Sequence, residues 1–204
     1  MRRSQTRRGE AGFTLVEALA VVAVIAIGTA LAAPAAMSAM ANRRATEAAH
    51  AVVRIGARGR SEAIGYGRAH VMTFTEDSSG PGGNHGRLEL WRGRADRCSA
   101  NDWATIITGT CAGNPSCIES LDMGAYAYPT HRVRLRLEGA NAGAICFQPN
   151  GDNFYAGAGG LWGTNPPAGI DAVQFRVQRL LENTPEGVDR FVVFPFGAGP
   201  RIRR

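Results

Sequence analysis

The most prominent feature of the hydrophobic pattern is an apolar stretch that runs from Phe13 to Ala41. The residues that interrupt it are Thr14, Glu17, Gly28, Thr29, Pro34 and Ser38. As an α-helix, this stretch would be about 43 Å long at 1.5 Å per residue, whereas the hydrocarbon core of a bilayer is about 30 Å thick. The pattern therefore predicts one membrane-spanning helix that extends beyond the bilayer.

The pattern changes after this stretch. Residues 42 to about 68 remain helical in character, with apolar positions every three or four residues. Beyond them, apolar and polar residues alternate in segments that predict β-strands: 70–75, 87–91, 132–138, 172–177 and 190–194. The 26 glycines and 10 prolines supply many turns. One long N-terminal helix followed by antiparallel strands predicts an α+β fold.

Arginines on the two sides of the apolar stretch predict its orientation. Before it stand Arg2, Arg3, Arg7 and Arg8, and directly after it stand Arg43 and Arg44. The end with more basic residues tends to stay in the cytoplasm. We therefore expect a single-pass protein with a cytoplasmic N-terminus and an exported body.

Three interpretations of the apolar stretch compete. A cleaved signal peptide would have a short apolar core and a small-residue cleavage site, which the alanines around 32–36 could supply. A plain membrane anchor is the second interpretation. Glu17 argues against both, because an acidic residue at the centre of a span costs about 2.5–3.5 kcal/mol, and less near an end. The third interpretation is a subunit whose carboxylate is neutralised by a charged partner.

The residues Gly12-Phe13-Thr14-Leu15-Val16-Glu17, after a short basic leader, resemble the prepilin peptidase site of type IV pilins and type II secretion pseudopilins. The resemblance implies that prepilin peptidase removes residues 1–12, cutting between Gly12 and Phe13, and that the new amine of Phe13 is methylated. It also implies that the apolar helix, residues 13–41, is retained. Pro34 stands where members of this class often carry a helix-kinking proline.

Glu17 has a physical role in this interpretation. Cleavage would create an ammonium group on Phe13, and Glu17 lies four residues further on, about one helical turn away. In a helical array, Glu17 of an incoming subunit could neutralise the Phe13 amine of a neighbour. The buried carboxylate is costly alone and satisfied in the assembly, so it favours association with other pilins or pseudopilins.

The body narrows the resemblance. The segments 60–64 and 67–72 are similar to the helix end and first strand of the GspH/FimT group of minor subunits, and 147–151 and 190–194 are similar to its strand–turn and C-terminal strand. The segment 84–128 matches nothing in that group. The resemblance implies residence in the cell inner membrane, with a periplasmic pilin-like domain of residues 42–204.

The four cysteines, Cys98, Cys111, Cys117 and Cys146, all lie in this body. An even number in an exported domain favours two disulfides, and the spacings lack the C-x-x-C pairs of a structural zinc site. Cys111 and Cys117 flank a short segment with Gly113 and Pro115, which favours their pairing and leaves Cys98 for Cys146. Four cysteines allow two other connectivities, which stay open.

All 23 basic residues are arginines, and half of the formal net charge of +6 lies in the first twelve residues. Three arginines alternate with apolar residues and predict one exposed strand face: Arg132, Arg134 and Arg136. Three more close the chain: Arg201, Arg203 and Arg204. A solvated face and tail is the simpler interpretation. The alternative is a phosphate-binding surface, because Gly199–Arg204 resembles a glycine–arginine element of pilus subunits linked to DNA uptake.

Acidic residues lie among these arginines in the sequence: Glu138, Asp171, Glu182, Glu186 and Asp189. We therefore expect DNA binding to be weak. The dispersed histidines predict no metal site, and no catalytic motif or cofactor loop is apparent. A minor pseudopilin is the leading hypothesis, followed by a minor type IV pilin with a DNA-binding role. A membrane-anchored exported enzyme is a distant third.

Overall fold

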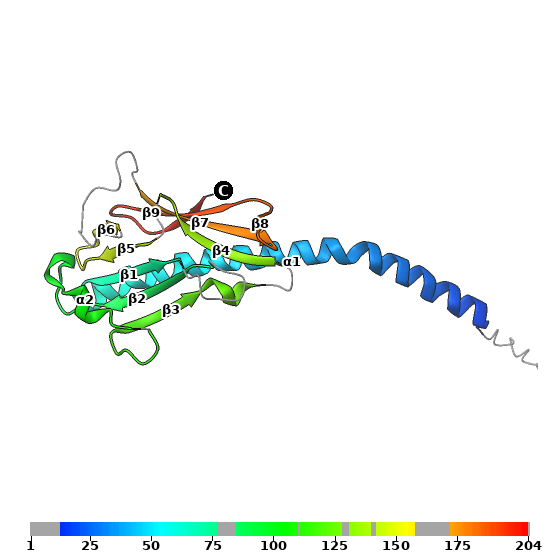
Figure 1. The fold of residues 1–204 in the computed structure, drawn as a ribbon, viewed down its shortest axis with the longest axis horizontal. Helices are drawn as coiled ribbons and strands as arrows, with labels where there is room; N and C mark the ends of the chain where they lie inside the picture. The colour runs from blue at the N-terminus through cyan, green and yellow to red at the C-terminus, as the bar shows by residue number, and fades with distance from the viewer. Residues whose placement is uncertain are drawn as a thin grey trace, which may run out of the picture. The chain divides into compact units, whose positions relative to one another are not determined.

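The computed structural model describes residues 13–76, 85–109, 111–127, 131–139, 142–157 and 172–203. Gly12 and the expected leader, as well as Asp171 and Arg204, lie outside the described residues. The chain divides into two compact units, which meet between Ala39 and Met40. The confirmed fold class is α+β, with one long helix and antiparallel sheets (Figure 1).

Helix α1 runs from Leu15 to Tyr66 and is 52 residues long, with Pro34 inside it. Up to Ala39 its side chains are almost all exposed, whereas from Met40 onward one face is buried in the globular unit. The helix ends at Tyr66 because Gly67 adopts a positive φ of 63°, the left-handed conformation that commonly terminates helices.

The first sheet contains five antiparallel strands in the order β3-β2-β1-β5-β6. Their bounds are β1 His70–Thr75, β2 Arg87–Arg92, β3 Cys117–Asp122, β5 Ala142–Phe147 and β6 Asn153–Gly157. Short helices flank β3: η1 Cys98–Ala100 and α2 Trp103–Ile106 precede it, and η2 Met123–Tyr126 follows it.

The second sheet has the order β10-β9-β7-β4 and is also antiparallel. Its strands are β4 His131–Leu137, β7 Ala172–Leu181, β9 Arg190–Pro195 and β10 Arg201–Arg203, with β8 Thr184–Pro185 paired to β7. In Figure 1 strands of both sheets lie along the second part of α1.

The main core forms where both sheets pack on this part of α1. Small residues on the helix allow the sheets to approach closely: a Cβ at Gly59 would lie 2.8 Å from the Phe147 ring, and one at Gly56 would overlap the Phe194 ring. Phe74, Phe175 and Phe194 continue the core in edge-to-face contacts with ring centroids 5.6 Å apart.

A second hydrophobic cluster joins Ala69, Val71, Trp91, Cys98 and Cys146, with Trp103 packed against it. Trp103 belongs to α2, and its indole N–H donates to the carbonyl of Cys98 at 2.8 Å. The segment 84–128, which matched nothing in the sequence resemblance, therefore contributes two strands to the first sheet and, through η1 and α2, part of this cluster.

Candidate assembly helix and arginine face

The first turn of α1 holds the residues expected to govern assembly. Phe13 is exposed over 72% of its surface, and Glu17 is exposed in the first turn of the helix. The backbone N–H of Glu17 donates to Oγ1 of Thr14 at 3.3 Å. Thr14-x-x-Glu17 thus has the sequence spacing of a capping box, a role for Thr14 that sequence reasoning missed. A helix start is fixed directly beside the expected new amine.

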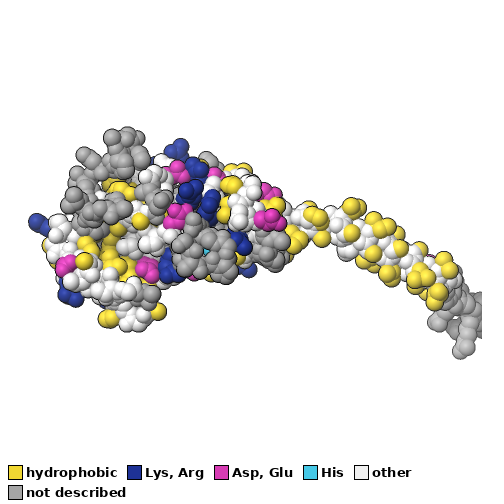
Figure 2. All heavy atoms as spheres, in the orientation of Figure 1, with side chains coloured by type: hydrophobic (Ala, Val, Ile, Leu, Met, Phe, Trp, Pro, Cys, Tyr) yellow, Lys and Arg dark blue, Asp and Glu magenta, His cyan; other side chains and the backbone are white. Residues whose placement is uncertain are grey.

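The helix up to Ala39 offers an apolar surface that the described part of this unit does not cover. Leu15, Val16, Leu19, Val22 and Ile25 are among its exposed large apolar residues. Hydrophobic side chains spread over the face of this segment seen in Figure 2. It is long and apolar enough to cross a membrane. Such a surface is stable only in lipid or against other apolar helices.

The arginines expected on one face of β4 do share a face, but only Arg136 is exposed, whereas Arg132 and Arg134 are half-buried. Arg132, Arg134 and Arg136 alternate with the buried Val133, Leu135 and Leu137. The strand register extends this face across the sheet, because Arg136 pairs with Arg176, Arg176 with Phe191, and Phe191 with Arg203. Directly paired residues point to the same side of a sheet.

Two of the three arginines expected in a charged tail belong to a strand. Arg201 and Arg203 are exposed residues of β10, on the same sheet face as Arg136. Three strand spacings, about 14 Å at roughly 4.8 Å each, separate β10 from β4 in this sheet. The structure brings the β4 arginines together with Arg201 and Arg203 onto one face, at opposite edges of the sheet.

Carboxylates neutralise much of this face. Arg176 Nε lies 2.6 Å from Glu138 Oε1 and 3.8 Å from Asp189 Oδ2. Arg136 Nε lies 3.8 Å from Glu76 Oε1. Figure 2 shows basic and acidic side chains intermixed on the globular unit. The face therefore carries a weaker positive potential than its arginine count implies.

Arg134 is half-buried on this face. Its Nη2 donates to Gln178 Oε1 at 3.3 Å. Burial, reinforced by the positive charge of Arg136, lowers the pKa of Arg134 from its ordinary value. Because Gln178 in turn donates to Asp189 at 3.3 Å, Arg134 belongs to a structural network of the sheet.

The comparisons with known proteins bear on the N-terminus. Residues 7–33 match the family model described as the prokaryotic N-terminal methylation motif. The chain carries a type IV pilin-like processing signal. The matched segment contains Gly12, Phe13 and Glu17 and covers a small part of the chain, so it supports a structural pilin-like subunit without identifying the body. No curated protein and no solved structure matches the chain.

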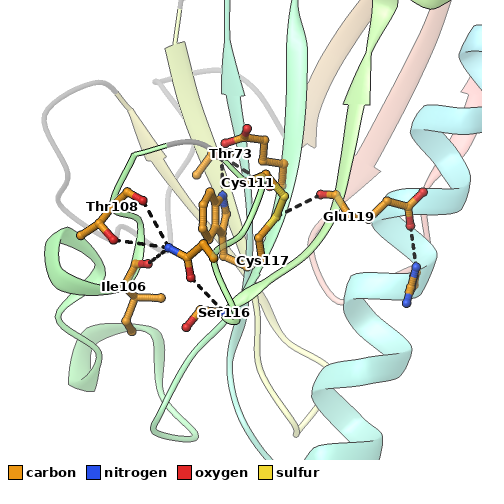
Figure 3. The surroundings of a disulfide bond; sticks show 11 residues. Thr73, Ile106, Thr108, Cys111, Ser116, Cys117 and Glu119 are labelled. Atoms are coloured by element: carbon orange, nitrogen blue, oxygen red, sulfur yellow. Dashed lines mark hydrogen bonds and ion pairs between the residues drawn. A yellow bond between two sulfur atoms is a disulfide. The ribbon is translucent and has the colours of Figure 1, made fainter.

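The cysteines form two disulfides, Cys98–Cys146 and Cys111–Cys117, which is the pairing favoured from the sequence. Cys98 and Cys146 are buried in the second hydrophobic cluster and tie η1 to β5. Cys111–Cys117 closes a short loop before β3, and Cys117 Sγ lies 3.7 Å from the carbonyl oxygen of Glu119 (Figure 3). The segment after β2 is therefore fixed at both ends.

Asn114 organises the loop inside the shorter disulfide. Its side-chain N–H groups donate to the carbonyls of Ile106 and Thr108 at 3.3 and 3.2 Å, and its Oδ1 accepts from the N–H of Ser116 at 2.9 Å. Figure 3 shows Ile106, Thr108 and Ser116 around this position. These bonds satisfy the turn itself, so we assign the loop a structural role.

Proposed function

We propose that the chain is a minor pseudopilin, a structural subunit of a type II secretion pseudopilus in the inner membrane. The observation that carries the proposal is the methylation motif at residues 7–33, followed directly by the exposed apolar helix surface. In this proposal residues 1–12 are a leader removed by prepilin peptidase, 13–41 form the assembly helix, and 42–204 form the periplasmic domain.

Assembly is driven by the charge of the Glu17 carboxylate, which only a partner subunit neutralises. Glu17 enters the bilayer as a costly carboxylate, and a neighbouring N-methylated Phe13 amine neutralises it in the filament. Pro34 lacks the N–H of a helix ladder and allows the helix to bend while it packs. The disulfides stabilise the exported body in an oxidising compartment.

Processing gives the direct test. N-terminal mass spectrometry of the membrane-extracted protein should find a chain that begins at Phe13 with a methylated amine. Replacing Gly12 with a bulkier residue should leave the leader attached. A mature chain that starts near Ala36 would instead identify an ordinary secreted protein.

A minor type IV pilin with a DNA-binding role is the second candidate, because Arg201 and Arg203 are exposed on one sheet face with Arg136. Phosphate contacts make log affinity fall with log salt by about 0.9 per contact. The carboxylates near Arg136 and Arg176 lead us to expect weak DNA binding. Replacing Arg201, Arg203 and Arg204 with glutamine should leave the DNA affinity unchanged. A tail-dependent sub-micromolar affinity in a salt titration would reverse the ranking.

The secretion and pilus assignments also differ in their genetic consequences. Deleting the gene of a pseudopilin should leave exported proteins behind in the periplasm, whereas deleting that of a DNA-uptake pilin should reduce transformation. Neighbouring genes for a secretion ATPase and an outer-membrane secretin, or for a retraction ATPase, provide an independent discriminator.

A further inference from the structure

The glycines of α1 differ in whether the surrounding packing requires a residue without a side chain. Gly56 and Gly59 face aromatic rings that leave no room for a Cβ. Gly65 is different: apart from its chain neighbours and the nearby backbone of its own helix, no heavy atom of the described chain lies within 4 Å of a Cβ built there, and its φ is not in the left-handed region. A glycine inside a helix costs about 1 kcal/mol relative to alanine. Packing among the described residues does not account for that cost.

Gly65 belongs to a groove along the exposed face of the helix. Ala57, Ser61 and Gly65 follow one another at intervals of four residues, and the groove has a volume of about 550 Å³. Arg54, Arg58, Glu62 and Tyr66 complete its lining. A row of small residues at this spacing lets a second helix approach closely.

Apolar side chains stand exposed at the end of this groove. Tyr66 is exposed over 61% of its surface and Ile64, on the same helix end, over 54%. The guanidinium of Arg92 covers one side of the Tyr66 ring, with its carbon 4.6 Å from the centroid. Exposed apolar groups beside a groove are typical of an interaction surface.

The charges around the groove do not balance. Glu119 Oε2 lies 2.9 Å from Nη1 of Arg58 and raises the pKa of that arginine, and Glu62 lies within 4 Å of both Arg58 and Arg92. Figure 3 shows the Glu119 carboxylate pointing toward the helix. Arg54 is 67% exposed and reaches Glu119 only at 3.7 Å. Among the described residues, two carboxylates thus serve three guanidinium groups, which leaves a net positive charge on this face, where Arg54 is the most exposed of the three.

We infer that this groove, lined by Ala57, Ser61 and Gly65, docks an amphipathic helix of another pilin-type subunit, which places small or apolar residues on the groove and a carboxylate beside Arg54. The inference rests on the proposed function and names a contact of the periplasmic domain. A second copy fits less well, because a symmetric pairing through the same surface would bring Arg54 of one copy toward Arg54 of the other.

Substitutions on the groove separate docking from folding. In the full-length chain, Ser61→Leu fills the groove at an exposed helical position, so thermal melts in detergent should stay unchanged. Recovery of the chain with other pilin-type subunits should fall at least tenfold. Gly65→Ala should keep or raise the melting temperature and weaken recovery less. His50→Leu, an exposed change on the same helix outside the groove, is the matched control and should leave both measurements unchanged.

A photo-reactive residue in place of Ala57 tests the occupant. The expected crosslink joins it to another pilin-type subunit, at a helical segment that contains Asp or Glu. A crosslink to a second copy, or none in a chain that still assembles, would overturn the inference, as would normal recovery of Ser61→Leu. The pilin-like class on which the proposed function depends fails separately: wild-type protein would then lack the methylated Phe13 and would not assemble at all.

Discussion

The two parts of α1 share many small residues but differ in charge and in packing. Both are rich in alanine and contain glycine, yet residues 13–39 expose nearly every side chain while residues 40–66 bury one face in the globular unit. Apart from its chain neighbours and its own helix backbone, Gly28 has no described heavy atom within 4 Å of a built Cβ, whereas a Cβ at Gly56 would overlap the Phe194 ring. Small residues in the second part accommodate the chain's own sheets. In the first part they leave space that other helices or lipid must fill, so the packing of this part is completed outside its own chain.

The largest expected effect is the loss of assembly in Glu17→Val. Removing the carboxylate should improve membrane insertion, because the desolvation cost disappears, and should reduce incorporation into a pilus-like complex at least tenfold. Co-purification with partner subunits measures the second effect. Glu17→Gln is a useful control, since it keeps a polar side chain at this position without the charge. Normal incorporation of Glu17→Val would show that charge pairing does not drive assembly.

Removing the disulfides tests the globular unit, whose packing is supplied by its own chain. In the chain-entropy view, losing the bond that spans 48 residues should lower the free energy of unfolding by about 4 kcal/mol, and losing the bond that spans 6 by about 2 kcal/mol. Denaturation of Cys98→Ala/Cys146→Ala and Cys111→Ala/Cys117→Ala variants gives both values. Equal losses would mean that loop entropy does not control their contributions.

The sequence predicted the elements whose alternation is clear. The segments 70–75, 87–91, 132–138, 172–177 and 190–194 correspond to β1, β2, β4, β7 and β9, with differences of a few residues at their ends. β5 was missed because Ala142, Gly143 and Ala144 offer no contrast between apolar and polar positions. β10 has only three residues and looked like a charged tail, since a strand this short exists only through its pairing with β9.

The candidate sites likewise divide into features that local sequence predicts and features that depend on the tertiary structure. The alternation at Arg132, Arg134 and Arg136 was readable because it depends on neighbouring residues alone. The register that places Arg203 in line with Arg136 depends on two intervening strands, which local sequence cannot specify. The difference between Gly59 and Gly65 likewise required knowing which side chains stand opposite each glycine.

A direct test of the helix comparison substitutes alanine for one glycine in each part. Gly56→Ala forces a Cβ into the Phe194 ring and should lower the free energy of unfolding by about 1–3 kcal/mol, the usual cost of overpacking. Gly28→Ala should leave body stability unchanged, because nothing of the described chain stands opposite it. Chemical denaturation followed by tryptophan fluorescence measures both. A stable Gly56→Ala variant would show that the sheets can move away from the helix.

The smallest expected effect is a pH dependence that belongs to the body alone. His70 is fully buried at the start of β1, and its Nδ1 lies 2.9 Å from the carbonyl oxygen of Arg68. Burial, reinforced by Arg92, lowers the pKa of His70 despite the opposing effects of that carbonyl and Glu62. An unfolded histidine titrates near pH 6.5, so the unfolded chain binds this proton first as the pH falls.

Stability from His70 should therefore be complete above about pH 6.5 and decrease below it, until the pH reaches the lower pKa of the folded state. Thermal melts of wild type and His70→Gln between pH 7.5 and 5 isolate this contribution, because the two proteins have all other ionisable groups in common. The wild-type melting temperature should fall more steeply with acidification than that of the variant. Parallel curves would mean that His70 can accept a proton where it is buried, for example by pairing with Glu62. The site of His70 next to the end of α1 would then be more accessible to water than its burial indicates.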